Sequence, residues 1–330
     1  MILLQELRKD YILDKWVITS KNRGNRPIQF KEQKKESKTE SKNCFFCPGN
    51  ENTTPTESYR WVDEVSNKSN NKGKWAIRAF PNKFAAVSLD KFPEKKKRLF
   101  SVKSAYGHHE VIVDIREHKK QLHDKDVNHF YKLIDVWCDR IDYFQNRKGI
   151  KYVILWKNHL REAGTSLIHS HCQLIAYNQE PVNIKEKTKA VVGYKRKYFK
   201  CPYCDIIEKE IKLKERLAFE NKSFVAICPY ASFYAHEIMI LSKRCVKSIL
   251  DLTEIEKKDL AKILKKVLFK LGKNNVPYNL EVNNGLKGKP FHFHISVTPR
   301  EFKLAGFEIG TGTIINSVSP EDAKRWYRSR

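Results

Sequence analysis

The sequence contains no uninterrupted apolar run of roughly eighteen residues, which is the length that a membrane-spanning helix needs. Its first residues, Met1 to Arg8, place charged side chains within a few positions of a very short apolar run, unlike a secretory signal. Both absences predict a soluble, cytoplasmic protein. In that compartment the eight cysteines are expected to be reduced thiols or metal ligands rather than disulfides.

Acidic residues are scarce, because 38 Asp and Glu stand against 64 Lys and Arg, giving a formal net charge of +26. Such an excess can indicate a nucleic-acid-binding protein. The lysines are nevertheless dispersed, and their densest runs fall in expected loops and linkers, at 31–42, 91–98 and 185–200. The charge therefore indicates a solvated basic exterior rather than a nucleic acid partner, and it would also attract phosphorylated sugars and nucleotides.

With 330 residues the chain is long enough for two domains, and a weak internal repeat indicates where they lie. Each half contains, in one order, a Cys-x-x-Cys pair, an Asn-Lys segment, a His-Glu strand, a metal-capable residue and a His-x-His pair. The matched positions are Cys44/Cys47 and Cys201/Cys204, Asn82 and Asn221, His109 and His236, His118 and Cys245, and His169/His171 and His292/His294. The repeat predicts an N-terminal domain over 1–180 and a C-terminal domain over 181–330.

The hydrophobic pattern predicts strands followed by a helix and a final strand in each half, which is an α+β fold. The expected strands are short apolar runs, at 111–113, 152–156 and 238–240. Helical spacing of apolar residues predicts helices over 127–143 and from residue 252 onward. Thr253 and Glu256 form the expected capping box of the second helix. The lysine-rich stretch 178–200 is expected to be a linker.

The pair Cys44-x-x-Cys47 has two interpretations in such a protein, a redox pair or half of a zinc site. A redox pair usually opens a helix, whose dipole lowers the pKa of the thiol. Here Pro48-Gly49-Asn50 follows directly and indicates a turn, which favours zinc. The repeat adds two imidazoles. The predicted set is a closed four-coordinate structural site, made of Cys44, Cys47, His118 and His169.

The second half offers a corresponding set of three thiols and one imidazole. Its members are Cys201, Cys204, Cys245 and His292. Because all four recur in register with the first set, they predict a second metal site. The alternative is a vestigial repeat whose cysteines pack as small apolar residues. Cys138, Cys172 and Cys228 have no such pattern and are expected to be core thiols.

A buried strand leads through a turn into the pattern His169-x-His171-x-Gln173. On an extended strand these three side chains project from one face, because strand side chains alternate. If a metal holds His169, then His171 remains on that face without a structural role. Neutral imidazole is a competent nucleophile near neutral pH, and a hydrogen bond from its other nitrogen to a carbonyl would fix the attacking tautomer. The pattern therefore predicts phosphoryl transfer with His171 as nucleophile.

The neighbouring polar groups suit the same chemistry. Gln173 can donate to a non-bridging phosphate oxygen without adding a titrating group. Gly164 permits close approach of the backbone, while Thr165 and Ser166 can offer donors to the charge that grows in the transition state. The alternative, that both histidines bind one metal, would leave Gln173 and this Gly-Thr-Ser turn without a role.

On these residues the chain resembles the galactose-1-phosphate uridylyltransferases of the histidine-triad superfamily. The specific part is His-x-His-x-Gln, where glutamine in place of a third histidine is associated with nucleotidyl transfer rather than hydrolysis. The resemblance covers almost the whole chain. Its other segments are Arg23–Pro27, Cys44–Glu51, Phe80–Phe84, Asn158 with Gly164–Ser166, and Ala305–Gly312. It implies two histidine-triad-like halves, each an antiparallel sheet packed with a helix.

The resemblance also implies a two-step displacement with ping-pong kinetics. His171 would attack the α-phosphorus of UDP-glucose, release glucose 1-phosphate and pass the uridylyl group to galactose 1-phosphate. The implied nucleotide and phosphate contacts are Arg23, Arg26, Asn82 and Asn158, with Ser166 and Gln173 at the transferred phosphoryl group and Phe307 and Glu308 at the hexose. The hexose contacts would come from the partner subunit of a homodimer. Zinc is implied at the first metal site.

The chain departs from the family pattern in places. Ser170 and Cys172 stand where proline and glycine are common. Some members use the second His-x-His to bind iron and lack the second cysteine pair, so zinc and iron both stay open there. The ending 306–312 is also similar to plant ADP-glucose phosphorylases, which makes adenylyl transfer the alternative activity. A hypothesis of another class, a zinc-stabilised nucleic-acid-binding protein, is supported only by charge and cysteine pairs.

Overall fold

The computed structural model describes residues 5–9, 16–20, 43–62 and 74–329. The chain divides into two compact units. Unit 1 comprises Met1–Lys120, Asp139–Leu155 and Ser166–Glu186, and unit 2 comprises Gln121–Cys138, Trp156–Thr165 and Lys187–Arg330. The predicted domains, 1–180 and 181–330, follow the sequence repeat, and their boundary remains a prediction. Among the described residues, no helix combines the length and apolarity that crossing a bilayer requires.

Unit 1 contains two sheets, and the strand pairs whose register is known are antiparallel. The smaller sheet has the order β2-β1-β6-β5, with β1 Glu6–Lys9, β2 Trp16–Thr19, β5 Lys95–Lys97 and β6 Phe100–Ser104. The larger runs β8-β9-β7-β4-β3, with β3 Tyr59–Val62, β4 Trp75–Pro81, β7 Gly107–Val113, β8 Tyr152–His159 and β9 His171–Tyr177. β8 is shared between the units.

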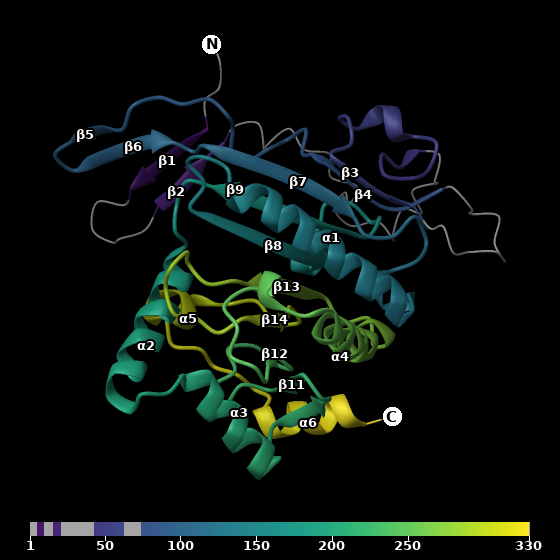
Figure 1. The fold of residues 1–330 in the computed structure, drawn as a ribbon, viewed down its shortest axis with the longest axis vertical. Coiled ribbons are helices and arrows are strands. Elements are labelled where there is room, and N and C mark those ends of the chain that lie inside the picture. The colour runs from purple at the N-terminus through teal and green to yellow at the C-terminus, as the bar shows by residue number, and fades with distance from the viewer. Residues whose placement is uncertain (1–4, 10–15, 21–42, 63–73, 330) are drawn as a thin grey trace. The chain divides into compact units, whose positions relative to one another are not determined.

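Helix α1 spans Val127–Gln145, and its last part, from Asp139 on, belongs to unit 1 and packs on one face of the larger sheet (Figure 1). Arg140 from this helix donates two hydrogen bonds of 2.9 Å to the Glu110 carboxylate of β7, and both side chains are buried. Strand side chains alternate, so Glu110 faces α1 while His109 and Val111 face the opposite side. That opposite side is where β9 presents His171 and Gln173.

The strands of unit 2 follow the order β10-β11-β12-β14-β13, with antiparallel neighbours throughout. Its strands are β10 Leu217–Glu220, β11 Phe224–Ile227, β12 Ile238–Ser242, β13 Tyr278–Asn283 and β14 His294–Pro299. Helix α4 (Glu254–Lys273) packs on β11 through a buried apolar stripe, in the predicted place. The other helices are α3 Pro202–Leu213, α5 Gly306–Thr311 and α6 Pro320–Arg328. The predicted α+β class is confirmed.

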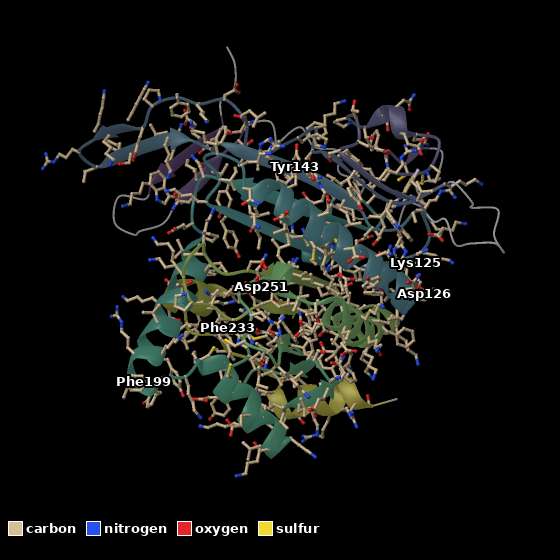
Figure 2. All side chains as sticks on the ribbon, in the orientation of Figure 1. Lys125, Asp126, Tyr143, Phe199, Phe233 and Asp251 are labelled. Carbon is tan, nitrogen blue, oxygen red and sulfur yellow. The ribbon has the colours of Figure 1, made fainter. Side chains whose placement is uncertain are left out.

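The predicted linker at 178–200 is wrong, because most of it is helix α2 (Val182–Tyr198). Ile184 and Val191 are buried two turns apart, whereas Lys189 and Lys195 are exposed. The helix ends at Tyr198, and the next residue, Phe199, has a positive φ of 58° and projects outward (Figure 2). An amphipathic helix needs only such widely spaced apolar residues. The high lysine content of the segment made this apolar spacing hard to recognise in the sequence.

The predicted capping box of α4 is present. The Thr253 hydroxyl accepts a hydrogen bond from the Glu256 amide, and the Glu256 carboxylate accepts one from the Thr253 amide at 2.8 Å. Arg244 also donates to this carboxylate, at 2.8 and 2.7 Å. The hydrogen bonds from Arg244 are the main reason why the pKa of Glu256 is lowered to about 2.

Replacing Glu256 by glutamine should therefore lower stability in a pH-dependent way. The carboxylate stabilises the fold above its ordinary pKa of 4.5, and this contribution disappears as the pH falls towards about 2. We expect a loss of roughly 1 kcal/mol at pH 7, in thermal unfolding, that shrinks on acidification. Arg244→Gln should show the same pH dependence, and a loss that stays constant from pH 7 to pH 2 would contradict this account.

Candidate active site and metal clusters

The site is built on the face of β7 and β9 that lies opposite α1. The two strands pair antiparallel, with Val111 opposite Gln173 and Val113 opposite His171. His171 and Gln173 are two residues apart in β9, so they share this face as predicted. His171 is buried and Gln173 is half-buried. β9 begins at His171, so His169 lies just before the strand rather than within it.

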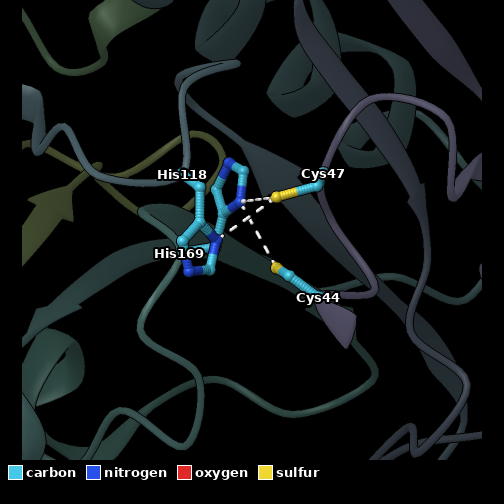
Figure 3. Close-up of side chains that lie close together, drawn as sticks. All are labelled: Cys44, Cys47, His118 and His169. Atoms are coloured by element: carbon cyan, nitrogen blue, oxygen red, sulfur yellow. Dashed lines mark hydrogen bonds between the residues drawn. The ribbon is translucent and has the colours of Figure 1, made fainter. Parts of the chain in front are cut away.

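The first four predicted metal ligands lie together in unit 1 (Figure 3). The Cys44 and Cys47 thiols are 3.5 and 3.6 Å from His169 Nδ1, and the Cys47 thiol is 3.2 Å from His118 Nδ1. All four ligand atoms lie within 4.8 Å of one another. Tetrahedral zinc with ordinary Zn–S and Zn–N bonds would separate such atoms by about 3.5 Å. The four residues can therefore hold a metal ion.

The pKa values of His169 and Cys47 in this cluster are those expected of a site that binds a cation. Burial is the main cause that lowers the pKa of His169 to about 4, so its ring is neutral and can ligate. Burial, followed by the neighbouring Cys44, raises the pKa of Cys47 to about 12. Two buried thiolates would be strongly disfavoured without a compensating charge. A divalent cation supplies that charge, because a coordinating thiol loses its proton.

The surroundings of His169 join this cluster to the candidate nucleophile. Its Nε2 lies 2.9 Å from the Ile115 carbonyl, which accepts the N–H and turns Nδ1 towards the thiols. Its own carbonyl lies 2.8 Å from His171 Nδ1. His171 therefore donates from Nδ1, and in the neutral ring the lone pair is on Nε2. The hydrogen bond that the sequence predicted for the attacking tautomer is present.

Phe46, which lies between Cys44 and Cys47 in the metal loop, packs against both histidines. Its ring is edge-on to His169 and His171, with centroid distances of 6.2 and 5.4 Å, and it also contacts Phe80 at 5.6 Å. Phe46, Phe80 and Val111 belong to one buried cluster with Cys44 and Cys47. The Cys-x-x-Cys loop thus also holds the apolar ring of Phe46 against the His171 ring.

The second set of predicted ligands lies together in unit 2. The thiols of Cys201 and Cys204 lie 3.6 and 3.8 Å from His292 Nδ1, and Cys245 completes the group. Burial opposes ionisation of Cys201, but hydrogen bonds from His292 and from backbone amides at the start of α3 outweigh it and lower its pKa to about 7. This group can also hold a metal ion.

The two halves repeat their hydrogen bonds as well as their sequence. His292 Nε2 lies 2.8 Å from the Ser242 carbonyl, as His169 Nε2 does near Ile115. His294 Nδ1 then lies 2.8 Å from the His292 carbonyl. Ser242 and Ile115 each precede their third metal candidate by three residues. The sequence repeat is therefore a repeat of local geometry.

In the second half, the ring nitrogen of His294 that corresponds to the proposed attacking atom is in contact with a lysine. Lys187 Nζ lies 3.0 Å from His294 Nε2, the atom that bears the lone pair in this tautomer. His294 is fully buried, and burial together with the Lys187 charge lowers its pKa to about 3. An imidazole that accepts from an ammonium group cannot attack phosphorus. In this arrangement His294 Nε2 is not available as a nucleophile.

The turn after β8 is tied down by a residue that the sequence did not single out. Asn279 of β13 donates from Nδ2 to Asn158 Oδ1 at 2.9 Å and to the Ala163 carbonyl at 2.8 Å. Gly164 has a φ of 91°, which favours glycine. Its missing Cβ would lie 3.8 Å from Asn158 Nδ2. Asn279 therefore fixes both the Asn158 amide and the start of the predicted Gly-Thr-Ser turn.

The remaining predicted residues are placed as follows. Arg23 and Arg26 lie outside the described residues. Asn82 follows β4, half-buried, and Thr165 and Ser166 are half-buried in the turn. Phe307 in α5 is 51% exposed, and Glu308 accepts a hydrogen bond from the Ala305 amide. These contacts do not assign a ligand, so their substrate roles remain predictions.

Sequence reasoning missed Phe46, which packs beside the candidate nucleophile, and Asn279, which holds the turn after β8. Phe46 lies between the two cysteines of the first pair, and that position was the available signal. Asn279 has no such signal, because its partners lie 121 and 116 residues earlier in the chain. His109 was noticed only as a member of the repeat.

Comparison with known proteins agrees with this geometry. The profile of the galactose-1-phosphate uridyl transferase N-terminal domain matches residues 2–181, and that of the C-terminal domain matches residues 153–312. ADP-glucose phosphorylase of Arabidopsis thaliana is 30% identical over 335 residues, covering 98% of this chain and 92% of the relative. Galactose-1-phosphate uridylyltransferase of Thermotoga maritima is also 30% identical, covering 98% of each chain.

A solved structure gives the same result. The crystal structure of an ADP-glucose phosphorylase from Arabidopsis thaliana with bound ADP-glucose has a TM-score of 0.75 and 27% identity, covering 99% of this chain and 98% of that one. Similarity in sequence and in structure thus extends over essentially the whole length. The chain belongs to the galactose-1-phosphate uridyl transferase family.

Proposed function

We propose that the protein transfers uridylyl groups from UDP-glucose to galactose 1-phosphate through a covalent intermediate on His171. The observation that carries this proposal is the hydrogen bond between His171 Nδ1 and the His169 carbonyl, because it puts the lone pair on Nε2. Gln173 on the same strand face adds a neutral donor group. Family membership supplies the class of reaction, which is nucleotidyl transfer.

In the first step, His171 Nε2 forms a bond to the α-phosphorus of UDP-glucose. The bond from that phosphorus to the bridging oxygen breaks, and glucose 1-phosphate leaves with the electron pair. Gln173 donates to a non-bridging oxygen, and Ser166 lies in the turn that precedes the strand. Donors held before the reaction stabilise charge that grows on these oxygens.

In the second step, a phosphate oxygen of galactose 1-phosphate attacks the same phosphorus. The nitrogen–phosphorus bond breaks, UDP-galactose leaves and His171 returns to its neutral state, which gives ping-pong kinetics. Asn82, Asn158, Gly164 and Thr165, together with Arg23 and Arg26, are the proposed nucleotide and phosphate contacts. Phe307 and Glu308 are the proposed hexose contacts, supplied by the partner subunit of a homodimer.

Adenylyl transfer by the same mechanism is the second candidate. The ADP-glucose phosphorylase of Arabidopsis thaliana is as similar in sequence as the bacterial uridylyltransferase. In that reaction ADP-glucose would modify His171, and inorganic phosphate would accept the adenylyl group. The chemistry at the nitrogen is unchanged, so only the base and the acceptor distinguish the two activities.

Zinc is the proposed metal in the first cluster, because two thiols and two imidazoles form one of its common closed ligand sets. Zinc or iron is proposed for the second cluster. A bound metal would supply structural cross-linking, and neither reaction step passes through it. A cytoplasmic location is also proposed, since none of the eight cysteines, all of which lie in the described residues, forms a disulfide, as is usual in a reducing compartment.

A labelling experiment distinguishes the two activities. Purified protein is incubated separately with UDP-glucose and ADP-glucose that carry the label on the α-phosphorus, then quenched and analysed by intact-mass spectrometry. We expect a uridylyl adduct from UDP-glucose that galactose 1-phosphate discharges. An adenylyl adduct discharged by inorganic phosphate would establish the second candidate instead. Absence of any adduct with both donors would reject the covalent mechanism.

A further inference from the structure

His109 lies at the meeting point of three segments of the candidate site. It belongs to β7, and its backbone carbonyl accepts a hydrogen bond of 2.7 Å from the backbone N–H of Asn82. In its side chain, Nδ1 lies 3.1 Å from the backbone nitrogen of Ala86. His109 Nε2 lies 3.1 Å from Gln173 Oε1. The side chain is 4% exposed, so it is almost completely buried.

The Ala86 contact determines the tautomer of His109. A backbone N–H can only donate, so His109 Nδ1 must accept and carries no proton. In the neutral ring the proton is then on Nε2, which must donate. Its partner at 3.1 Å is therefore the oxygen of the Gln173 amide and not the nitrogen. The direction of the Ala86 N–H is fixed by the backbone, so this contact, rather than the side-chain amide of Asn82, decides the tautomer.

The side-chain amide of Asn82 does not compete for the proton on His109 Nε2. Its Oδ1 accepts a hydrogen bond of 2.9 Å from the Phe84 amide, so its Nδ2 is the group that faces His109, at 3.2 Å. Two N–H donors cannot bond to each other. Gln173 Oε1 is thus the acceptor for His109, and the orientation of the Gln173 amide is set.

We propose that His109 is a positioning residue that holds the Gln173 amide so that its N–H group, not its oxygen, is presented to the transferred phosphoryl group. This inference rests on the proposed nucleotidyl transfer. Non-bridging phosphate oxygens are acceptors, so a reversed Gln173 amide would place one acceptor against another. Without His109, both orientations of the amide would be populated.

Comparison of the two halves shows that the histidines at the matched positions 109 and 236 make different contacts. His236 is the counterpart of His109, but its Nδ1 lies 3.0 Å from Glu301 Oε2 and its ring packs on Trp326 at 4.5 Å. Its φ is 58°, outside the strand region in which His109 lies. The contact of His109 with the Gln173 amide is thus specific to the half that contains the candidate nucleophile.

Two conservative variants separate the functions of the two ring nitrogens. In His109→Asn, the amide oxygen can still accept from Ala86, but no donor reaches Gln173. In His109→Gln, the longer amide restores a donor near the place of Nε2. We expect His109→Asn to slow formation of the nucleotidyl-protein roughly tenfold, with unchanged melting temperature and metal content, and His109→Gln to recover most of this rate. His236→Asn is the matched control and should react at the wild-type rate.

A double-mutant cycle distinguishes positioning from a purely structural role. If His109 acts through Gln173, then His109→Asn should cause no further loss in a Gln173→Ala background. Additive losses, or equal rates for His109→Asn and wild type, would overturn the proposal. An unlabelled wild-type protein would instead reject the proposed function. Independently of activity, ¹⁵N NMR should show His109 protonated at Nε2, and protonation at Nδ1 would also overturn the inference.

Discussion

Replacing His171 by alanine should abolish nucleotidylation of the protein while leaving the fold and both metal clusters intact. The ring donates from Nδ1 to the His169 carbonyl, so the variant loses one hydrogen bond and the attacking nitrogen. Loss of a covalent nucleophile costs far more than loss of a binding contact, and we expect a decrease of at least about 10⁴-fold. Intact-mass spectrometry with the labelled donor measures the effect directly.

The control for this experiment is the repeat counterpart of the nucleophile. His294→Gln retains an oxygen that can accept from Lys187, and Lys187 lies 3.0 Å from His294 Nε2 in the wild type. This variant should still form the adduct. An adduct in His171→Ala would show that another residue is the nucleophile, and loss of the adduct in both variants with unchanged melting would contradict the assignment to one half.

Apolar periodicity was sufficient to predict two of the helices and three short strands. The spacing over 127–143 and the start at Thr253 correspond to α1 and α4, because a buried face imposes its period directly on the sequence. The same rule failed for α2, where Ile184 and Val191 are separated by many charged residues. There the composition suggested a linker, although helix formation requires only a narrow apolar stripe.

The candidate site was predictable where its residues are close in sequence or repeated. The metal groups could be assembled because each Cys-x-x-Cys pair recurs with its later partners, and the structure brings each group together. Alternation along a strand placed His171 and Gln173 on one face. The link between Asn279 and Asn158, and that between Ala86 and His109, have no such signal. Both depend on how distant segments pack, which a single sequence does not encode locally.

Removing the first metal group should reduce stability strongly and affect the chemistry only through folding. In Cys44→Ser the loop that carries Phe46 loses its link to His118 and His169, so the Phe46 ring beside His171 is no longer held. We expect a loss of about 5 kcal/mol or more, because structural zinc contributes roughly 10–16 kcal/mol in zinc-dependent peptides. Thermal unfolding with and without a chelator, alongside metal analysis, measures this loss.

Cys228→Ala is the matched control, because Cys228 is also fully buried but lies outside both clusters. It should lose only about 1 kcal/mol. Because both clusters are intact in this variant, the chelator should destabilise it as much as the wild type, whereas Cys44→Ser should respond less. At a temperature where Cys44→Ser remains folded, its rate of adduct formation should stay near that of the wild type, since a backbone carbonyl fixes the His171 tautomer. If the metal-free protein melted unchanged, the cluster would have no structural role. If it stayed folded but formed no adduct, the metal would act on the chemistry itself.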